Sequence, residues 1–262
     1  MPGTDDDHAL AAELAGRAGQ LLLALRAGGG DREALKQAGD RQAHEFLLDE
    51  LARRRPGDAV LSEEGTDGKD RLSADRVWIV DPLDGTREFG EDGRADWAVH
   101  VALWCRAAAA GGALTAGAVA LPAQGMLLAT DAPMPVPMPV PSPGTGPRPV
   151  RMVVSRSRPA GLARLVADRI GAELVPCGSA GAKVATVVTG ENDVYFHSGG
   201  FYEWDTAAPA AVARARGCHV SRIDGSPVRF NQPDPWLQDI LVCRPEIAGP
   251  LLNAIRETTH AI

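Results

Sequence analysis

The stretch that most constrains this chain is a short apolar run that ends in an acidic turn. Residues 77–80 (Val-Trp-Ile-Val) have the composition of a buried strand, and they lead directly into the segment DPLDGT. Pro82 has a fixed φ and no N–H, and Gly85 tolerates a positive φ. The pattern therefore predicts a sharp turn that holds Asp81 and Asp84 at one place.

The two acids of this turn indicate a metal site. Carboxylates three residues apart repel each other unless a cation lies between them. A hard divalent cation takes oxygen ligands from carboxylates and main-chain carbonyls. Gly85 and Thr86 follow, and there backbone N–H groups and a hydroxyl can contact a phosphate oxygen or a water. The alternative is an Asp-rich turn in which Asp84 and Thr86 only cap the next helix.

The overall composition excludes several classes of function. The 262 residues carry a net charge of −7, which argues against a nucleic-acid surface, because phosphate backbones require clustered Lys and Arg. No run approaches the ~18 apolar residues of a membrane helix, and the acidic N-terminus lacks the pattern of a secretory signal. The four cysteines have no C-x-x-C spacing, which disfavours a zinc site. We therefore expect a cytoplasmic protein that binds neither nucleic acid nor membrane.

The first half of the chain predicts helices followed by strands. Leucines at helical spacing indicate a helix over about residues 10–25, and a second helix begins near Asp40, which occupies the place of an N-cap, and stops at Pro56. A short strand-like run then precedes the adjacent acids Glu63 and Glu64. The following strands, which suggest an antiparallel meander, are expected at residues 97–105, 113–122 and 125–130.

A Pro-rich tract separates the two halves. Residues 133–149 contain eight of the 20 prolines and cannot join a sheet ladder, so they are expected to form a surface insertion. This divides the chain into an α+β half (1–132) and an α/β half (150–262). The second half alternates strands at 150–155, 173–176, 193–197 and 239–243 with helices at 160–171, 180–190, 204–217 and 245–258.

Two stretches of the second half hold further candidates. Asp205 stands just before an expected helix, and taken alone it is explained by a role as the N-cap. The stretch GSAGAK (178–183) lacks the spacing of a phosphate loop, and its Lys183 can either meet an anion or belong to a plain helix start.

Three acidic motifs together resemble a known family. They are SEE at 62–64, DPLDGT at 81–86 and WDTAAP at 204–209. This set, in this order, is similar to the signature of the lithium-sensitive, magnesium-dependent phosphatases of the inositol monophosphatase superfamily. The resemblance spans most of the chain. It implies a five-layered αβαβα sandwich, as in inositol monophosphatase and fructose-1,6-bisphosphatase, whose two halves meet at the active site.

Within this superfamily the chain looks most like the CysQ-type 3′-phosphoadenosine 5′-phosphate phosphatases. DGTREF resembles their DGTKEF, SRSR (155–158) resembles S-R-S-H, and GSAGAK resembles the G-x-G-x-K segment that meets the nucleotide. AGDRQA resembles the A-D-R-x-A of the second helix. Arg87 for Lys, Arg158 for His and a missing V-T before Asp40 are departures, which concern the substrate contacts and a third metal site near Asp40.

The resemblance implies a set of metal ligands. Glu63, Asp81 and the carbonyl of Leu83 would hold one Mg²⁺, and Asp81, Asp84 and Asp205 would hold a second. Two cations roughly 4 Å apart stabilise the attacking and leaving oxygens of an in-line displacement.

The resemblance also assigns the residues around the phosphate. Thr86, helped by Asp40, would orient the attacking water, and the N–H groups of Gly85 and Thr86 would hold phosphate oxygens. The rest of the substrate is expected to contact Ser155, Ser157, Arg158, Gly178 and Lys183.

The reaction implied by the resemblance is removal of the 3′-phosphate from 3′-phosphoadenosine 5′-phosphate to give AMP. An inositol monophosphatase or a fructose-1,6-bisphosphatase would share every metal ligand and remains an alternative. A second alternative is a metal-stabilised scaffold without activity. The expected partner is a small phosphorylated substrate, and the family habit is a homodimer.

Overall fold

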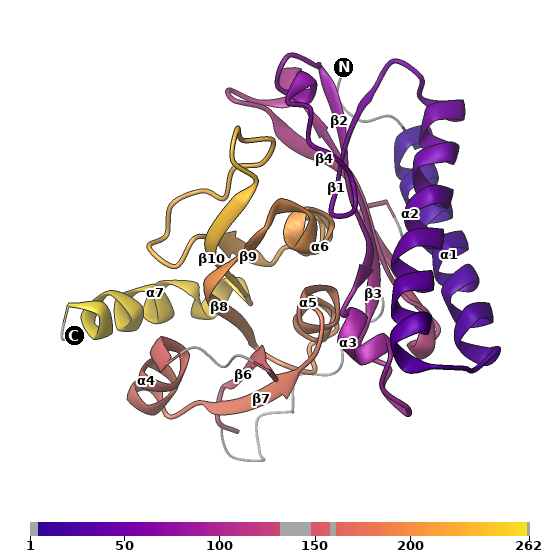
Figure 1. Cartoon of the computed structure of the whole chain (residues 1–262). Coiled ribbons are helices and arrows are strands. Elements are labelled where there is room, and N and C mark those ends of the chain that lie inside the picture. Colours follow the sequence, from indigo (N-terminus) through magenta and orange to yellow (C-terminus); the bar gives the residue numbers. More distant parts are fainter. Residues whose placement is uncertain (1–4, 132–147, 158–160, 261–262) are drawn as a thin grey trace.

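The computed structural model of the protein describes residues 5–131, 148–157 and 161–260, and these form two sheets with helices around them (Figure 1). The first half contributes α1 (Asp5–Ala27), α2 (Arg32–Arg54), β1 (Ala59–Ser62), β2 (Arg76–Asp84), α3 (Thr86–Phe89), β3 (Ala98–Cys105), β4 (Ala113–Leu121) and β5 (Met126–Ala129). Short 3₁₀ turns lie at Asp70–Leu72, Arg106–Ala108 and Pro122–Gln124.

The second half alternates strands and helices, as the sequence predicts. Its elements are β6 (Arg151–Ser155), α4 (Gly161–Ile170), β7 (Glu173–Cys177), α5 (Ala180–Val188), β8 (Val194–Tyr202), α6 (Glu203–Ala215), β9 (His219–Ser221), β10 (Trp236–Cys243) and α7 (Pro245–Thr259). β8 runs beyond the predicted end at residue 197. The short strand β9 was not predicted, because three residues are too few to show a period of two.

The elements stack in five layers (Figure 1). The first sheet has the order β1-β2-β3-β4-β5 and the second the order β7-β6-β8-β10-β9. Helices α1 and α2 cover the outer face of the first sheet, α5 and α6 lie between the sheets, and α4 and α7 cover the outer face of the second. The expected αβαβα sandwich is confirmed. Because α6 contacts β2, β3 and β4, a helix of the second half completes the core of the first sheet.

The first sheet presents the acidic turn at the end of its β2 strand. β1 pairs with β2 in parallel, and β2, β3, β4 and β5 pair antiparallel in succession, which confirms the predicted meander. The register of β2 against β3 shifts between Asp81, which pairs with His100, and Asp84, which pairs with Ala98. One extra residue on β2 forms a bulge here, because Pro82 has no N–H to give to the ladder.

The second helix begins earlier than the sequence predicts. Its N-cap is Asp31, whose side chain accepts the N–H groups of Glu33 and Ala34, and Asp40 lies inside the helix. The prediction of an N-cap at Asp40 is therefore wrong. The preceding Gly39 does not break the helix; a Cβ there would lie 2.8 Å from Phe89 Cε1, so the glycine permits close packing against α3.

Two further expectations concern the Pro-rich insertion and membrane-spanning helices. Residues 133–147 of the predicted Pro-rich insertion lie outside the described residues. Over the described part of the chain, none of the helices combines the length and the apolar character needed to cross a membrane.

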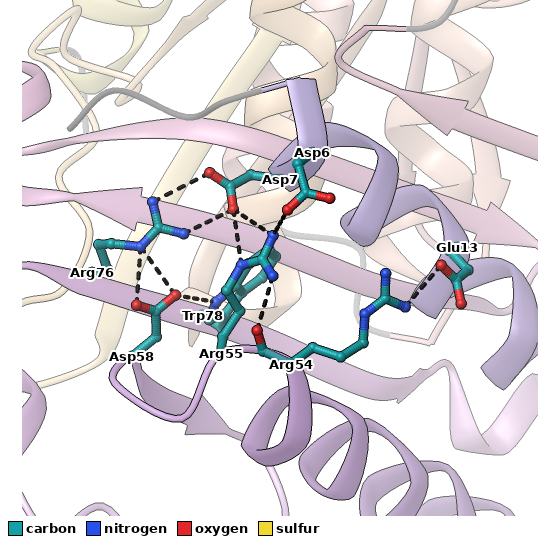
Figure 2. A network of polar contacts seen from close by, with 8 residues as sticks. All are labelled: Asp6, Asp7, Glu13, Arg54, Arg55, Asp58, Arg76 and Trp78. Carbon is teal, nitrogen blue, oxygen red and sulfur yellow. Dashed lines mark hydrogen bonds and ion pairs between the residues drawn. The ribbon is translucent and has the colours of Figure 1, made fainter.

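A partly buried ion-pair network ties α1 and the end of α2 to the start of the first sheet (Figure 2). Asp7 of α1 is 2% exposed and receives hydrogen bonds from Arg55 and from Arg76. Arg76 also donates from Nε to Asp58, and Asp58 accepts the indole N–H of Trp78 at 2.8 Å. Arg76 is therefore the cation that contacts both Asp7 and Asp58. Removing the partner of a buried charge is strongly destabilising.

We expect Arg76→Met to lower the free energy of unfolding by about 3 kcal/mol, because Asp7 and Asp58 would lose their main cation. Urea denaturation followed by circular dichroism measures this. Arg53→Met is the control: Arg53 is 65% exposed and pairs only with Glu50 among the described residues, so its loss should stay within about 0.5 kcal/mol. Equal effects of the two substitutions would contradict the role of the network.

Candidate active site

Three carboxylates converge where β2 ends and α6 begins. One oxygen each of Asp81, Asp84 and Asp205 lies within 4.8 Å of the other two. Asp81 is 1% exposed and Asp84 7%, so water screens their charges poorly. Asp205 lies in the first turn of α6 rather than before it, and its side chain accepts the N–H of Tyr202 at 2.6 Å. The capping role and the place in the acidic cluster therefore coexist in Asp205.

A fourth acid, Glu63, approaches the cluster from the neighbouring strand. β1 runs parallel to β2, so the residues that follow β1 lie beside the acidic end of β2. Burial of its carboxylate and the charges of Asp205 and Asp84 together raise the pKa of Glu63 to about 8, although a hydrogen bond with Asp81 acts in the opposite direction.

The crowding of these acidic side chains shifts their pKa values. Burial, with the charges of Glu63 and Asp84, raises the pKa of Asp81 well above its usual range. Burial and the charge of Asp84 raise the pKa of Asp205 to about 6. Burial acts to raise the pKa of Asp84, but His100, Lys183 and the N–H of Gly181 together outweigh it, so the pKa is lowered. The groups that meet here offer carboxylate oxygens, which are hard donors, and a divalent cation would stabilise them in the charged form, so this donor set fits Mg²⁺.

His100 of β3 supports the cluster and was missed by the sequence analysis. It is fully buried; its Nε2 lies 3.2 Å from Asp84 Oδ2, and its Nδ1 lies 3.1 Å from the carbonyl oxygen of Trp204. Both ring nitrogens therefore lie close to oxygen atoms of neighbouring residues. The sequence signal for His100 is that it is an ionisable residue within the otherwise apolar run Ala98–Cys105.

Helix α5 supplies the second support of Asp84. The N–H of Gly181 donates to Asp84 Oδ2 at 2.7 Å. A Cβ at Gly181 would overlap His100 Nε2 and lie 2.9 Å from Ala98 Cβ, so only glycine allows α5 to approach β3 this closely. Ser179 caps α5 by accepting the N–H of Ala182, so GSAGAK is both a helix start and a wall of the site.

Thr86 and Asp40 meet as the resemblance implied. Thr86 Oγ1 lies 3.1 Å from Asp40 Oδ1 and 3.2 Å from the carbonyl oxygen of Leu83. Burial raises the pKa of Asp40 to about 6, although the hydrogen bond from Thr86 opposes this. Gly85 precedes α3 with φ +90°, which other residues adopt only with strain, so the tight turn after the acids requires glycine.

A cavity of about 460 Å³ opens from the acidic cluster. The predicted site residues that line it are Glu63, Asp84, Gly85, Ser155, Ser157, Gly178, Lys183 and Asp205. Arg158 lies outside the described residues. Aromatic residues outside the predicted set of site residues also line this cavity; they are Tyr195, His197, Phe201, Tyr202, Trp204 and Trp236.

The cations near the cavity have different surroundings. Lys183 is buried, donates to the carbonyl of Gly178 and lies 5.4 Å from the ring centroid of Tyr195. Burial lowers the pKa of Lys183, and the charge of Asp84 opposes this. Arg156 of the SRSR segment instead pairs with Glu88 and Glu91 and so joins the two halves of the chain. Arg87 is exposed and lines the cavity.

Gly181→Ala should reduce kcat/KM roughly 100-fold, because the added methyl group must push α5 away from His100 and Asp84. Steady-state kinetics measures this, with circular dichroism to check folding. Gly249→Ala in α7 is the control, since a Cβ there meets nothing within 4 Å, and it should leave kcat/KM unchanged. Activity of Gly181→Ala within threefold of the parent would contradict the close approach.

Removal of divalent metal should make stability fall with rising pH. The carboxyl pKa values of Asp205 (about 6) and Glu63 (about 8) exceed their usual values near 4. The folded state then holds protons that the unfolded state has lost, so this contribution is present in full below about pH 4 and is lost as pH rises through 6 and 8. We expect the Tm in EDTA to fall between about pH 5.5 and about pH 8.5, and millimolar Mg²⁺ to reverse most of the fall. A Tm in EDTA that rises over this pH range would contradict the prediction. The same dependence of Tm on pH in Asp205→Asn as in the parent would also contradict it.

Known proteins resemble this chain over nearly its whole length. A sequence model of the inositol monophosphatase family matches residues 8–133 and 147–260. The 3′-phosphoadenosine 5′-phosphate phosphatase of Mycobacterium leprae is 50% identical over 259 residues, which are 96% of this chain and 94% of the relative. The 3′(2′),5′-bisphosphate nucleotidase CysQ of Escherichia coli K12 is 29% identical over 205 residues, which are 76% of this chain and 81% of the relative.

Solved structures agree with the sequence matches. CysQ from Bacteroides thetaiotaomicron superposes with a TM-score of 0.75 at 27% identity, covering 91% of this chain and 97% of that one. Inositol monophosphatase II from Staphylococcus aureus MSSA476 gives 0.76 at 20% identity, covering 95% and 96%, and this second likeness concerns the fold alone. The expected fold type is confirmed. With the family match and the curated relatives, these findings show that the chain belongs to the inositol monophosphatase family and is a phosphatase.

Proposed function

We propose that this protein is a Mg²⁺-dependent phosphatase that removes the 3′-phosphate of 3′-phosphoadenosine 5′-phosphate to give AMP and phosphate. The observation that carries the proposal is the cluster of Asp81, Asp84 and Asp205 beside a 460 Å³ cavity. The name of the relative that is 50% identical supports the substrate.

The metal ligands in this proposal come from three elements. Glu63, Asp81 and the Leu83 carbonyl would hold one Mg²⁺, and Asp81, Asp84 and Asp205 a second. When bound, these cations would neutralise the charge of the phosphoryl group and polarise its oxygens. The chain holds the ligands in place through Gly181 N–H and His100 on Asp84, and through the N–H of Tyr202 on Asp205.

Thr86 and Asp40 would direct the attacking water. When ionised, Asp40 accepts the hydroxyl hydrogen of Thr86. The lone pairs of Thr86 Oγ1 can then accept a hydrogen bond from the water, which aims a water lone pair at phosphorus. Water adds to phosphorus as the bond from phosphorus to the 3′ oxygen breaks. The attacking water releases a proton to solvent, and the departing oxygen takes up a proton from solvent water. The N–H groups of Gly85 and Thr86 would hold the phosphate oxygens.

The remainder of the substrate would occupy the cavity beyond the acids. Arg87 and Lys183 are the cations among the described lining residues, and the 5′-phosphate would lie toward them. Ser155, Ser157 and Gly178 also line the cavity and offer hydroxyl and backbone groups.

The substrate assignment predicts a clear preference. The acidic cluster contacts only the scissile phosphate, so discrimination comes from the rest of the cavity. We expect 3′-phosphoadenosine 5′-phosphate to be hydrolysed with a kcat/KM at least about tenfold above those of inositol 1-phosphate and fructose 1,6-bisphosphate. Phosphate release with Mg²⁺ measures this.

Asp84→Asn is the control for this panel, because it removes a charged oxygen ligand without a change in size. It should abolish release from every substrate while the Tm stays near that of the parent. An equal or higher kcat/KM for inositol 1-phosphate would move the assignment to the sugar and inositol phosphatases of the same family.

A further inference from the structure

Two large aromatic side chains stand exposed at the cavity. Tyr202 is 41% exposed and Trp236 is 44% exposed, and both line the cavity that Asp84 and Asp205 also line. Burying such rings would stabilise the fold, so their exposure requires another reason. The proposed function assigns them no part.

The two rings belong to an ordered cluster, which we call the aromatic wall and define as Tyr202, Trp204 and Trp236. The Tyr202 ring stacks on Trp204 with centroids 4.6 Å apart and planes 10° apart. Trp236 meets Tyr202 edge to face, with centroids 5.3 Å apart and planes at 79°. Such pairs hold their members in one orientation.

The backbone is shaped to carry this wall. Trp236 of β10 pairs with Tyr202 of β8 across the second sheet. Gly200 has φ +86°, and a Cβ there would overlap the indole of Trp236, so the indole lies directly on the backbone of β8. The N–H of Glu203 donates to the Pro235 carbonyl at 2.8 Å, which fixes the segment before Trp236 to the start of α6. One side of the Trp236 indole therefore packs on the backbone of Gly200, and part of the ring stays exposed to solvent.

The wall is also joined to the acidic cluster. The N–H of Tyr202 donates to Asp205, and the carbonyl of Trp204 faces His100. These bonds use the backbone, so the Tyr202 and Trp236 side chains can change without removing them. A phosphate at the acids and a flat group at the wall would thus lie in one cavity.

We propose that the aromatic wall is a stacking subsite for the purine base of the substrate, with Trp236 and Tyr202 as specificity-determining residues. This inference rests on the proposed function, since it assumes a nucleotide substrate. Bases stack on aromatic side chains through their π-faces, whereas inositol and sugar phosphates have no such face. Cations such as Lys183 and Arg87 attract any second phosphate equally, so the wall separates a nucleotide from a sugar bisphosphate.

The test compares Trp236→Leu with Trp236→Phe, because both keep an apolar side chain and only Phe keeps a ring. With 3′-phosphoadenosine 5′-phosphate as substrate, Trp236→Leu should raise KM about tenfold with kcat changed less than about twofold, and Trp236→Phe should restore most of the loss. Inorganic phosphate has no base, so it should inhibit the two Trp236 variants and the parent with the same inhibition constant. Leu165→Ala, which removes a 46% exposed apolar side chain on α4, is the surface control.

A binding measurement makes the outcome independent of turnover. AMP should quench tryptophan fluorescence of the parent, and the quench should be lost in Trp236→Leu. Tyr202→Leu should weaken AMP binding in the same direction, which covers the case that a Trp236 variant fails to fold. An unchanged KM and an unchanged AMP affinity in these variants would overturn the subsite while leaving the phosphatase assignment intact. A parent that binds AMP through Trp236 but does not hydrolyse the bisphosphate would overturn the proposed function instead.

Discussion

The mutual repulsion of Asp81, Asp84 and Asp205 is the constraint on which the rest of this structure depends. Three carboxylates within 4.8 Å oppose folding unless a cation joins them or protons remain on them. The chain holds them there because β2 is buried along nearly its whole length and cannot move its end away from α6. The strain of the site is thus supported by the hydrophobic core of the first sheet, not by the residues of the turn alone.

The supports of the cluster come from both halves of the chain. Gly181 and Tyr202 belong to the second half, while His100 belongs to the first and reaches across to Trp204. Arg156 adds an ion pair to Glu88 across the same junction. The packing of α5 and α6 against the first sheet therefore brings the acids and their hydrogen-bond donors together.

The lining of the cavity combines two kinds of chemistry. It includes carboxylates, which suit a metal and a phosphate, and aromatic rings, which suit a flat base. Because Tyr202 and Asp205 lie in a single segment, a shift of the start of α6 would move both groups together. In our proposals the carboxylates perform the reaction and the aromatic rings select the substrate.

The sequence by itself determined the local parts of this protein: the strand that ends in Asp81 and Asp84, the meander after it, the alternation of the second half, and the family. These depend on periodicity, turn chemistry and motif order, which act over a few residues. Only the tertiary structure decided that His100 serves Asp84 and that Trp236 stands beside Tyr202. Those facts depend on residues distant in sequence whose approach is set by packing, and a single chain carries no local signal for such distances.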